Sequence, residues 1–145
     1  MNLVIDSSVA IKWFVAETLQ AEAESLLTSS HRRVAPDLFI PEFLNALWKK
    51  TIRKEIEIGQ ARLISRQIVM PIYIERFVDS AALRERALEL ALAWNHPVYD
   101  CFYAACAEAI DGTLVSADDR LLRVLTRHDS AIRRVALSDA AGIGA

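Results

Sequence analysis

Short apolar runs that alternate with helical segments are the feature that most constrains the fold of this chain. Leu3–Ile5 and Leu114–Val115 are too short for helices, and each is followed by polar residues that favour the start of one. Val34–Ala35 and Val135–Leu137 are further runs of this kind. Parallel strands need crossover connections, and helices usually supply them. The sequence therefore predicts a three-layer α/β/α sandwich with a short, mostly parallel central sheet.

Helices are predicted between these strands from apolar residues at helical spacing. A short helix over Val9–Val15 and a second one that carries Leu19 through Leu27 precede the second strand. An extended stretch is expected around Ile72–Ile74, after Pro71 has stopped the preceding helix. The remaining predicted helices cover Leu38–Lys54, Gln60–Val69, Ala81–Trp94 and Tyr99–Ala109, and another begins at Asp118.

Composition and glycine placement exclude several kinds of protein. The 145 residues include 17 Lys plus Arg and 19 Asp plus Glu, and the resulting net charge of -2 excludes a strongly basic binding arm. With 53% hydrophobic residues the chain can bury a core without a disulfide or a structural metal, and we expect one domain over residues 1–145. None of the four glycines directly follows the first strand, which excludes phosphate-binding loops of the Walker and Rossmann types.

Cysteine usage and the first residues predict a cytoplasmic protein. Cys101 and Cys106 lie five residues apart in a predicted helix, about 140° apart around its axis, and cannot form a disulfide there. No second cysteine pair or neighbouring histidine favours a zinc site. Asp6 interrupts the opening apolar run too early for a signal peptide, and no apolar run of about 18 residues is present to span a membrane.

Five acidic side chains occupy positions of chemical interest. Asp6 follows the first strand, and Asp118 and Asp119 follow the strand at 114–115; an N-cap explains one carboxylate at each place but not the second acid of the pair. Asp100 stands at the start of a small apolar helix, where it could also serve the helix dipole. Glu42 lies among apolar side chains, and a buried carboxylate needs a cation, hydrogen bonds or a proton.

These carboxylates predict a metal centre if they meet at the carboxyl edge of the sheet. Mutual repulsion would oppose their ionisation unless a cation were present. Oxygen ligands without Cys or His favour Mg²⁺ or Mn²⁺ over zinc, and His31, His96 and His128 fit no ligand pattern, so that surface or loop positions are expected for them. Such a centre suits hydrolysis of phosphodiesters, because a metal ion can activate water and stabilise charge on the transferring phosphate.

Four segments of the chain carry a family resemblance: Val4–Ala10, Pro41–Leu47, Val98–Glu108 and Leu114–Leu121. In order and spacing they resemble the PIN-domain ribonucleases, and within them the VapC toxins of toxin–antitoxin pairs. The resemblance spans nearly the whole chain. It implies a PIN-like fold, a metal-dependent endoribonuclease activity, an RNA substrate, a homodimer and inhibition by a cognate VapB-type antitoxin.

The resemblance also implies roles for individual residues. The three aspartates of the family's acidic quartet would hold one or two Mg²⁺ or Mn²⁺ ions, while Glu42 would orient or deprotonate the attacking water. Ser116 stands where the family has Thr or Ser, and its hydroxyl would support a ligand. Asp119 is an auxiliary candidate. The quartet corresponds here to Asp6, Glu42, Asp100 and Asp118.

The surfaces for substrate and partner are less well defined by the sequence. Two groups of basic residues are candidates for contact with RNA phosphates, although charged helix faces more often serve solubility. Trp48, beside Leu44 and Leu47, fits either the core or a dimer face. No motif identifies the RNA. The first basic group is Lys49, Lys50, Arg53 and Lys54, and the second is Arg120, Arg123 and Arg127.

Three alternatives to a ribonuclease fit these residues less well. A PIN-like module that binds RNA or a partner without catalysis is disfavoured by the intact quartet. A phosphatase with an aspartate nucleophile expects a second Asp two residues after Asp6, where this chain has Ser8. A phosphoacceptor receiver domain expects its acid pair near the first strand, whereas Asp118 and Asp119 lie near the C-terminus.

Overall fold

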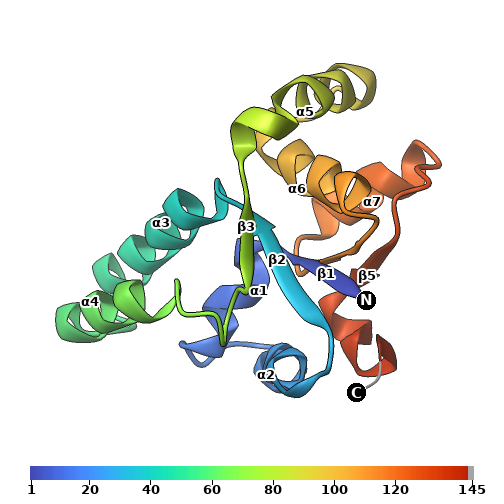
Figure 1. The fold of residues 1–145 in the computed structure, drawn as a ribbon. Helices are drawn as coiled ribbons and strands as arrows, with labels where there is room; N and C mark the ends of the chain where they lie inside the picture. Colours follow the sequence, from blue (N-terminus) through green and yellow to red (C-terminus); the bar gives the residue numbers. More distant parts are fainter. Residues whose placement is uncertain (144–145) are drawn as a thin grey trace.

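A five-stranded, wholly parallel sheet forms the centre of the computed structural model, which describes residues 1–143 (Figure 1). The strand order is β3-β2-β1-β4-β5, and each neighbouring pair is parallel. The predicted α/β fold class and the mostly parallel sheet are confirmed. The strands are β1 (Asn2–Ile5), β2 (Arg32–Pro36), β3 (Arg76–Val78), β4 (Thr113–Ser116) and β5 (Arg134–Ala136).

Helices cover both faces of the sheet and complete the three layers. The chain runs from β1 to β3 in one direction across the sheet and from β3 back to β5 in the other, so right-handed crossovers place their helices on opposite faces. Figure 1 shows α5, α6 and α7 on one side and α1 to α4 on the other. The helices are α1 (Ser7–Ala10), η1 (Ile11–Trp13), α2 (Gln20–Thr28), α3 (Phe39–Ile52), α4 (Ile58–Gln67), α5 (Ser80–Trp94), α6 (Val98–Ala109), α7 (Asp119–Arg127) and η2 (Leu137–Ile143).

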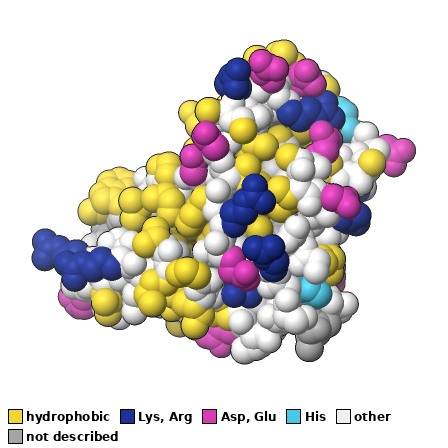
Figure 2. All heavy atoms as spheres, in the orientation of Figure 1, with side chains coloured by type: hydrophobic (Ala, Val, Ile, Leu, Met, Phe, Trp, Pro, Cys, Tyr) yellow, Lys and Arg dark blue, Asp and Glu magenta, His cyan; other side chains and the backbone are white. Residues whose placement is uncertain are grey.

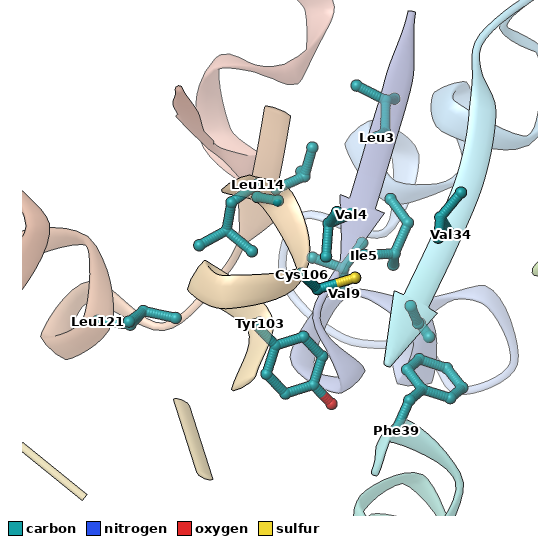
Figure 3. Close-up of a cluster of buried hydrophobic side chains, with 14 of the residues drawn as sticks. Leu3, Val4, Ile5, Val9, Val34, Phe39, Tyr103, Cys106, Leu114 and Leu121 are labelled. Atoms are coloured by element: carbon teal, nitrogen blue, oxygen red, sulfur yellow. The ribbon is translucent and has the colours of Figure 1, made fainter. Parts of the chain in front are cut away.

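The core is built around β1, the middle strand. Its Leu3, Val4 and Ile5 are completely buried because helices cover both faces, and this explains why the strand is a continuous apolar run. The small side chains of α6 let this helix pack closely on the sheet, and Figure 3 shows Tyr103 and Cys106 of α6 among the side chains of β1 and β4. Cys106 and Cys101 are both buried and unbridged, as the sequence predicts.

Two elements differ from the sequence prediction. The extended stretch expected around Ile72–Ile74 is wrong, because residues 71–73 form a turn with Ile72 exposed, and the strand follows at Arg76–Val78 instead. This β3 is an edge strand paired only with β2. Because charged residues flank it, no apolar run indicates a strand at this place in the sequence. The helix predicted over Val9–Val15 is also wrong in extent, since it divides into the short α1 and the 3₁₀ turn η1.

A buried arginine fixes the turn that leads into β3. Arg33 of β2 is only 6% exposed. Its guanidinium donates to the carbonyl oxygens of Leu26 at 3.1 Å, Ile72 at 3.0 Å and Tyr73 at 2.8 Å, and its Nη2 lies 3.8 Å from a carboxylate oxygen of Glu75. A charge can be buried here because its donors are hydrogen-bonded. Arg33 therefore ties α2 and the turn to the edge of the sheet.

An apolar surface remains exposed on α3 and α4. Trp48 is 59% exposed, so it does not belong to the core, and Leu44 and Ile52 of α3 and Leu63 of α4 are also exposed. Figure 2 shows hydrophobic side chains gathered over the part of the molecule that these two helices form. None of the helices in the described part of the chain is long and apolar enough to cross a bilayer.

The role of Arg33 predicts a large loss of stability on its removal. Arg33→Met keeps an apolar side chain but removes the guanidinium donor of four carbonyl oxygens, that of His31 included, and we expect the free energy of unfolding to fall by about 3–5 kcal/mol. Urea denaturation followed by circular dichroism measures the change. Arg32→Met is the control, because Arg32 pairs with the same Glu75 from an exposed position and should matter by less than about 1 kcal/mol. Equal losses in the two variants would contradict the prediction.

Candidate active site

The carboxyl ends of β1 and β4 bring two predicted site residues to one crevice. These strands are neighbours in the sheet, and the chain leaves them in opposite directions, which makes this the topological switch point where open α/β sheets bind ligands. Asp6 directly follows β1 and its backbone N–H donates to the carbonyl oxygen of Val115 in β4 at 3.2 Å. Asp118 follows β4 and is the N-cap of α7.

Asp6 is buried beneath this crevice, with 7% of its surface exposed. The hydroxyl of Ser116 donates to its Oδ2 at 2.7 Å, and the backbone N–H of Ser8 donates to its Oδ1 at 3.4 Å. Burial raises the pKa of Asp6 above its ordinary value and nearby Asp100 adds repulsion, while the hydrogen bonds from the two serines oppose the increase. The contact expected from Ser116 to an acid of the quartet is present.

Asp118 is held by the same serine. Its backbone N–H donates to the hydroxyl oxygen of Ser116 at 2.9 Å, so that this buried hydroxyl links the residues that follow β1 and β4. The carboxylate of Asp118 accepts from the backbone N–H of Arg120 at 2.9 Å and lies 3.7 Å from the Arg120 guanidinium. Asp118 is therefore the N-cap of α7, and only one of its two carboxylate oxygens takes part in that hydrogen bond.

Glu42 enters the crevice from the first turn of α3. The hydroxyl of Tyr103, a buried residue of α6, donates to its Oε1 at 2.5 Å. Burial raises the pKa of Glu42 from 4.5 to about 7, and repulsion from Asp6 and Asp100 acts in the same direction, against the hydrogen bond from Tyr103. Glu42 is thus a carboxyl group that can exchange a proton near neutral pH.

Asp100 lies in the first turn of α6 and contacts a histidine. Nε2 of His96 lies 2.7 Å from its Oδ2. His96 lies in a loop, as predicted, but the sequence does not indicate its contact with Asp100. Asn95 ends α5 with a left-handed φ of 49°, which reverses the chain and places His96 over the start of α6.

The four acids line one cavity of about 340 Å³, together with Asn45, Lys49 and Arg120. The structure brings the whole quartet together from β1, α3, α6 and β4, which are distant in sequence. Asp119, the auxiliary candidate, does not line this cavity; it lines another one along α7, together with Arg123 and Arg127. The other two histidines lie elsewhere: His31 contacts the carbonyl oxygen of Ile143, and His128 stacks on Trp94.

The donor set of this cavity fits a hard divalent cation. Its acids supply carboxylate oxygens only. Burial, with a contribution from mutual repulsion, raises the pKa values of Asp6 and Glu42, and a positive ion would favour their charged forms. The acids surround the cavity rather than forming a tight cluster: over residues 1–143, no three His, Cys, Asp or Glu side chains meet closely enough to hold one ion. The metal itself therefore stays a prediction.

Comparison with known proteins identifies the family. A family model described as the PIN domain matches residues 3–125, which include all four acids. The chain belongs to the PIN domain family. The resemblance found in the sequence is confirmed, and the quartet of this PIN domain lies at the carboxyl edge of its sheet.

Individual relatives support this placement. This PIN domain is 29% identical, over 83% of its own length and 92% of the relative's, to a curated protein named Ribonuclease VapC3 from Pyrobaculum aerophilum. The crystal structure of PAE2754 from the same organism matches 98% of this chain and 90% of its own with a TM-score of 0.70 and 20% identity. VapBC2 from Rickettsia felis, solved with a promoter DNA fragment, matches 94% and 98% with a TM-score of 0.64 and 12% identity.

The raised pKa of Glu42 predicts a pH-dependent effect of its replacement. Folded protein binds a proton at Glu42 up to about pH 7, whereas the unfolded chain releases it near pH 4.5, so stability conferred by this group is present below pH 4.5 and is lost as the pH rises to 7. Glu42→Gln, which keeps an acceptor for Tyr103, should be more stable than the unchanged protein by about 1–2 kcal/mol at pH 8, a value reduced for partial exposure.

Urea denaturation at pH 5 and pH 8 in the presence of EDTA measures this difference. The gain from Glu42→Gln should nearly vanish at pH 5, where the native carboxyl group is also neutral. Glu85→Gln on the exposed surface of α5 is the matched control and should leave the pH profile unchanged. A Glu42→Gln protein that is less stable than the original at pH 8 would show that the carboxylate is not strained by burial.

Proposed function

We propose that this PIN domain is a metal-dependent endoribonuclease that hydrolyses RNA phosphodiester bonds. The observation that carries the proposal is the convergence of Asp6, Glu42, Asp100 and Asp118 on one cavity at the switch point of the sheet. Carboxylates gathered in this way suit a hard cation, and a phosphodiester is a substrate whose hydrolysis such a cation assists. The relative named Ribonuclease VapC3 supports the same activity.

The residues of the site divide the chemistry between them. Asp6, Asp100 and Asp118 would hold Mg²⁺ or Mn²⁺, which when bound would activate water and stabilise the charge on the phosphate. Glu42, with its pKa near 7, accepts a proton from the attacking water, and the Tyr103 hydroxyl fixes the orientation of that carboxylate. Ser116 fixes Asp6 in turn.

The alternatives weighed from the sequence fit these contacts less well. An aspartate-nucleophile phosphatase needs a second acid at position 8, whereas the Ser8 hydroxyl accepts a hydrogen bond from the backbone N–H of Ala117 at 3.2 Å and so ties the β1 end to the β4 end. A binding module without catalysis would not need a group whose pKa is near 7, such as Glu42, beside three aspartates. Measured metal binding without cleavage of any RNA would favour that second function.

The proposal includes a biological setting. Two solved relatives, VapBC2 from Rickettsia felis and VapBC-1 from Haemophilus influenzae, carry names of toxin–antitoxin pairs. We propose that this chain is the toxin of such a pair, that a cognate VapB-type antitoxin inhibits it, and that it forms a homodimer. A cytoplasmic location is part of the proposal, and the two buried, unbridged cysteines are compatible with a reducing compartment.

Neighbouring aspartates provide a matched test of the nuclease proposal. Asn caps helices as well as Asp does, so Asp118→Asn should keep α7 intact while removing a ligand charge. Purified Asp118→Asn and Asp6→Asn should each lose RNA cleavage in Mg²⁺ or Mn²⁺ by roughly 100-fold or more, since even outer-shell changes at metal sites cost 10–100-fold. Asp119→Asn, which alters the adjacent exposed acid, should cleave within about twofold of the original protein.

Gel analysis of labelled RNA and calorimetry with Mn²⁺ give two independent readouts. EDTA should abolish cleavage, and Asp6→Asn should weaken Mn²⁺ binding while leaving thermal unfolding in EDTA unimpaired. Undiminished cleavage by Asp6→Asn, or cleavage that persists in EDTA, would refute the proposed mechanism.

The toxin role predicts an effect on growing cells. Induction of the chain alone in a bacterial host should arrest growth within one or two doublings, and Asp100→Asn should relieve the arrest at equal protein level. Growth curves together with immunoblots measure this. Arrest that is equal for Asp100→Asn would show that any toxicity is independent of the acidic site.

A further inference from the structure

The acidic cavity shares part of its lining with a second cavity that has a different chemical character. This second cavity has a volume of about 580 Å³ and lies between the start of α6 and the exposed side of α7. Glu42, Asp100 and Arg120 line both cavities, so the two spaces adjoin. The remaining wall of the second cavity carries an aromatic ring, a histidine and further guanidinium groups, from Tyr99, His96, Arg123 and Arg127.

The arginines of α7 carry charge that the fold does not use. Nε of Arg123 donates to a carbonyl oxygen of its own helix, that of Asp119, at 3.2 Å. Among residues 1–143, neither Arg123 nor Arg127 forms a salt bridge with an acidic side chain, and both are exposed. Like charges four residues apart destabilise a helix, so the pair is unfavourable until an anion lies between them. This arrangement indicates a surface for a negatively charged ligand.

The other basic group from the sequence analysis is already partly neutralised. Lys50 of α3 lies 2.5 Å from a carboxylate oxygen of Glu17 and 3.3 Å from one of Glu55. Lys49 lines the acidic cavity itself, where it faces the quartet. Arg53 and Lys54 are exposed and form no salt bridge within residues 1–143, but they line neither cavity. The group on α7 is therefore better placed for RNA, because all three of its arginines line the cavity that shares Glu42 and Asp100 with the acidic one.

Tyr99 supplies the second kind of contact that an unpaired nucleotide needs. It precedes Asp100 in the first turn of α6, and it is 60% exposed although its ring lines the cavity. An aromatic ring held on a helix beside free guanidinium groups can stack on a base while the arginines bind phosphates, and single-stranded nucleic acids are bound in this way. A base within a duplex offers no free face for such stacking.

We propose that the cavity along α7 binds the single-stranded stretch of RNA next to the scissile phosphate. Arg123 and Arg127 contact its phosphates, and the ring of Tyr99 stacks on one base. This inference rests on the proposed ribonuclease function and adds to it the path of the substrate along α7 and the three side chains that hold it. The acids of the first cavity then receive one phosphate from a strand that is already held by the second.

Binding of a fluorescein-labelled, unstructured RNA 12-mer, measured by fluorescence anisotropy in Mg²⁺, tests the proposal. Asp6→Asn serves as the common background so that the RNA is not cleaved. Arg123→Ala and Arg127→Ala, made together in this background, should raise Kd by about tenfold or more at low salt. They should also reduce the slope of log Kd against log salt by about 1.4, since each phosphate contact on a single strand contributes about 0.7. Tyr99→Ala should raise Kd by about fivefold or more without changing the slope, and Tyr99→Phe should not.

The control pair is Arg62→Ala with Arg66→Ala in the same background. These two arginines have the same spacing and are exposed on α4, far along the chain from the cavity, so they match the loss of charge and should change Kd by less than twofold. In protein that retains Asp6, the Arg123 and Arg127 changes should raise KM for the 12-mer while kcat stays within about twofold. A perfect duplex of the same length should bind about tenfold more weakly than the single strand.

The outcomes separate this inference from the proposed function. Protein that cleaves RNA but shows equal losses in the α7 pair and the α4 pair overturns the inference alone, because the effect is then one of net charge. Equal binding of duplex and single strand overturns it as well. Protein that retains Asp6, binds Mn²⁺ and cleaves no RNA overturns the proposed function, and the inference falls with it.

Discussion

One buried serine hydroxyl organises the catalytic edge of the sheet. Ser116 Oγ donates to the carboxylate of Asp6 and accepts from the backbone N–H of Asp118, so it joins the ends of β1 and β4, which lie 110 residues apart. If this hydroxyl were removed, Asp6 and Asp118 would each lose a hydrogen bond that water could not replace, because Ser116 is completely buried. Threonine offers the same hydroxyl and would preserve the link, whereas alanine would not. The position of Asp6 thus depends on a contact between strands as well as on the backbone N–H of Ser8 in its own loop.

The remaining acids are each fixed by a side chain from another segment. Glu42 of α3 is held by Tyr103 of α6, and Asp100 of α6 is held by His96 from the preceding loop. These contacts hold the acids in place although burial, together with repulsion from Asp6 and Asp100, raises the pKa of Glu42 to about 7. A divalent cation would favour the charged forms and so act in the opposite direction. The helix α6 is central to this arrangement, because it packs on the sheet and supplies both an acid and the tyrosine.

Local pattern was sufficient to predict the acids and insufficient to predict the side chains that support them. Asp6 and Asp118 follow apolar strands, and parallel topology alone places such positions on one edge. Tyr103 reads in the sequence as one more apolar residue of α6, since its hydroxyl finds Glu42 only after folding. Arg33 likewise gives no signal of burial, yet its bonds to Ile72 and Tyr73 explain why that segment turns and the edge strand begins later.

The formal net charge of -2 conceals a separation of acidic from basic residues, and the proposed function requires this separation. Four carboxylates around one cavity would repel RNA, which is a polyanion. A bound cation would relieve this repulsion only near itself, at the phosphate that reacts. The rest of the strand has to be attracted by charge placed beyond the acids but close to them. Arg123 and Arg127 meet that requirement, because they line the cavity that adjoins the acidic one and form no salt bridge within residues 1–143. Acidic residues then determine where the bond is cut, and basic residues determine which part of the RNA lies there.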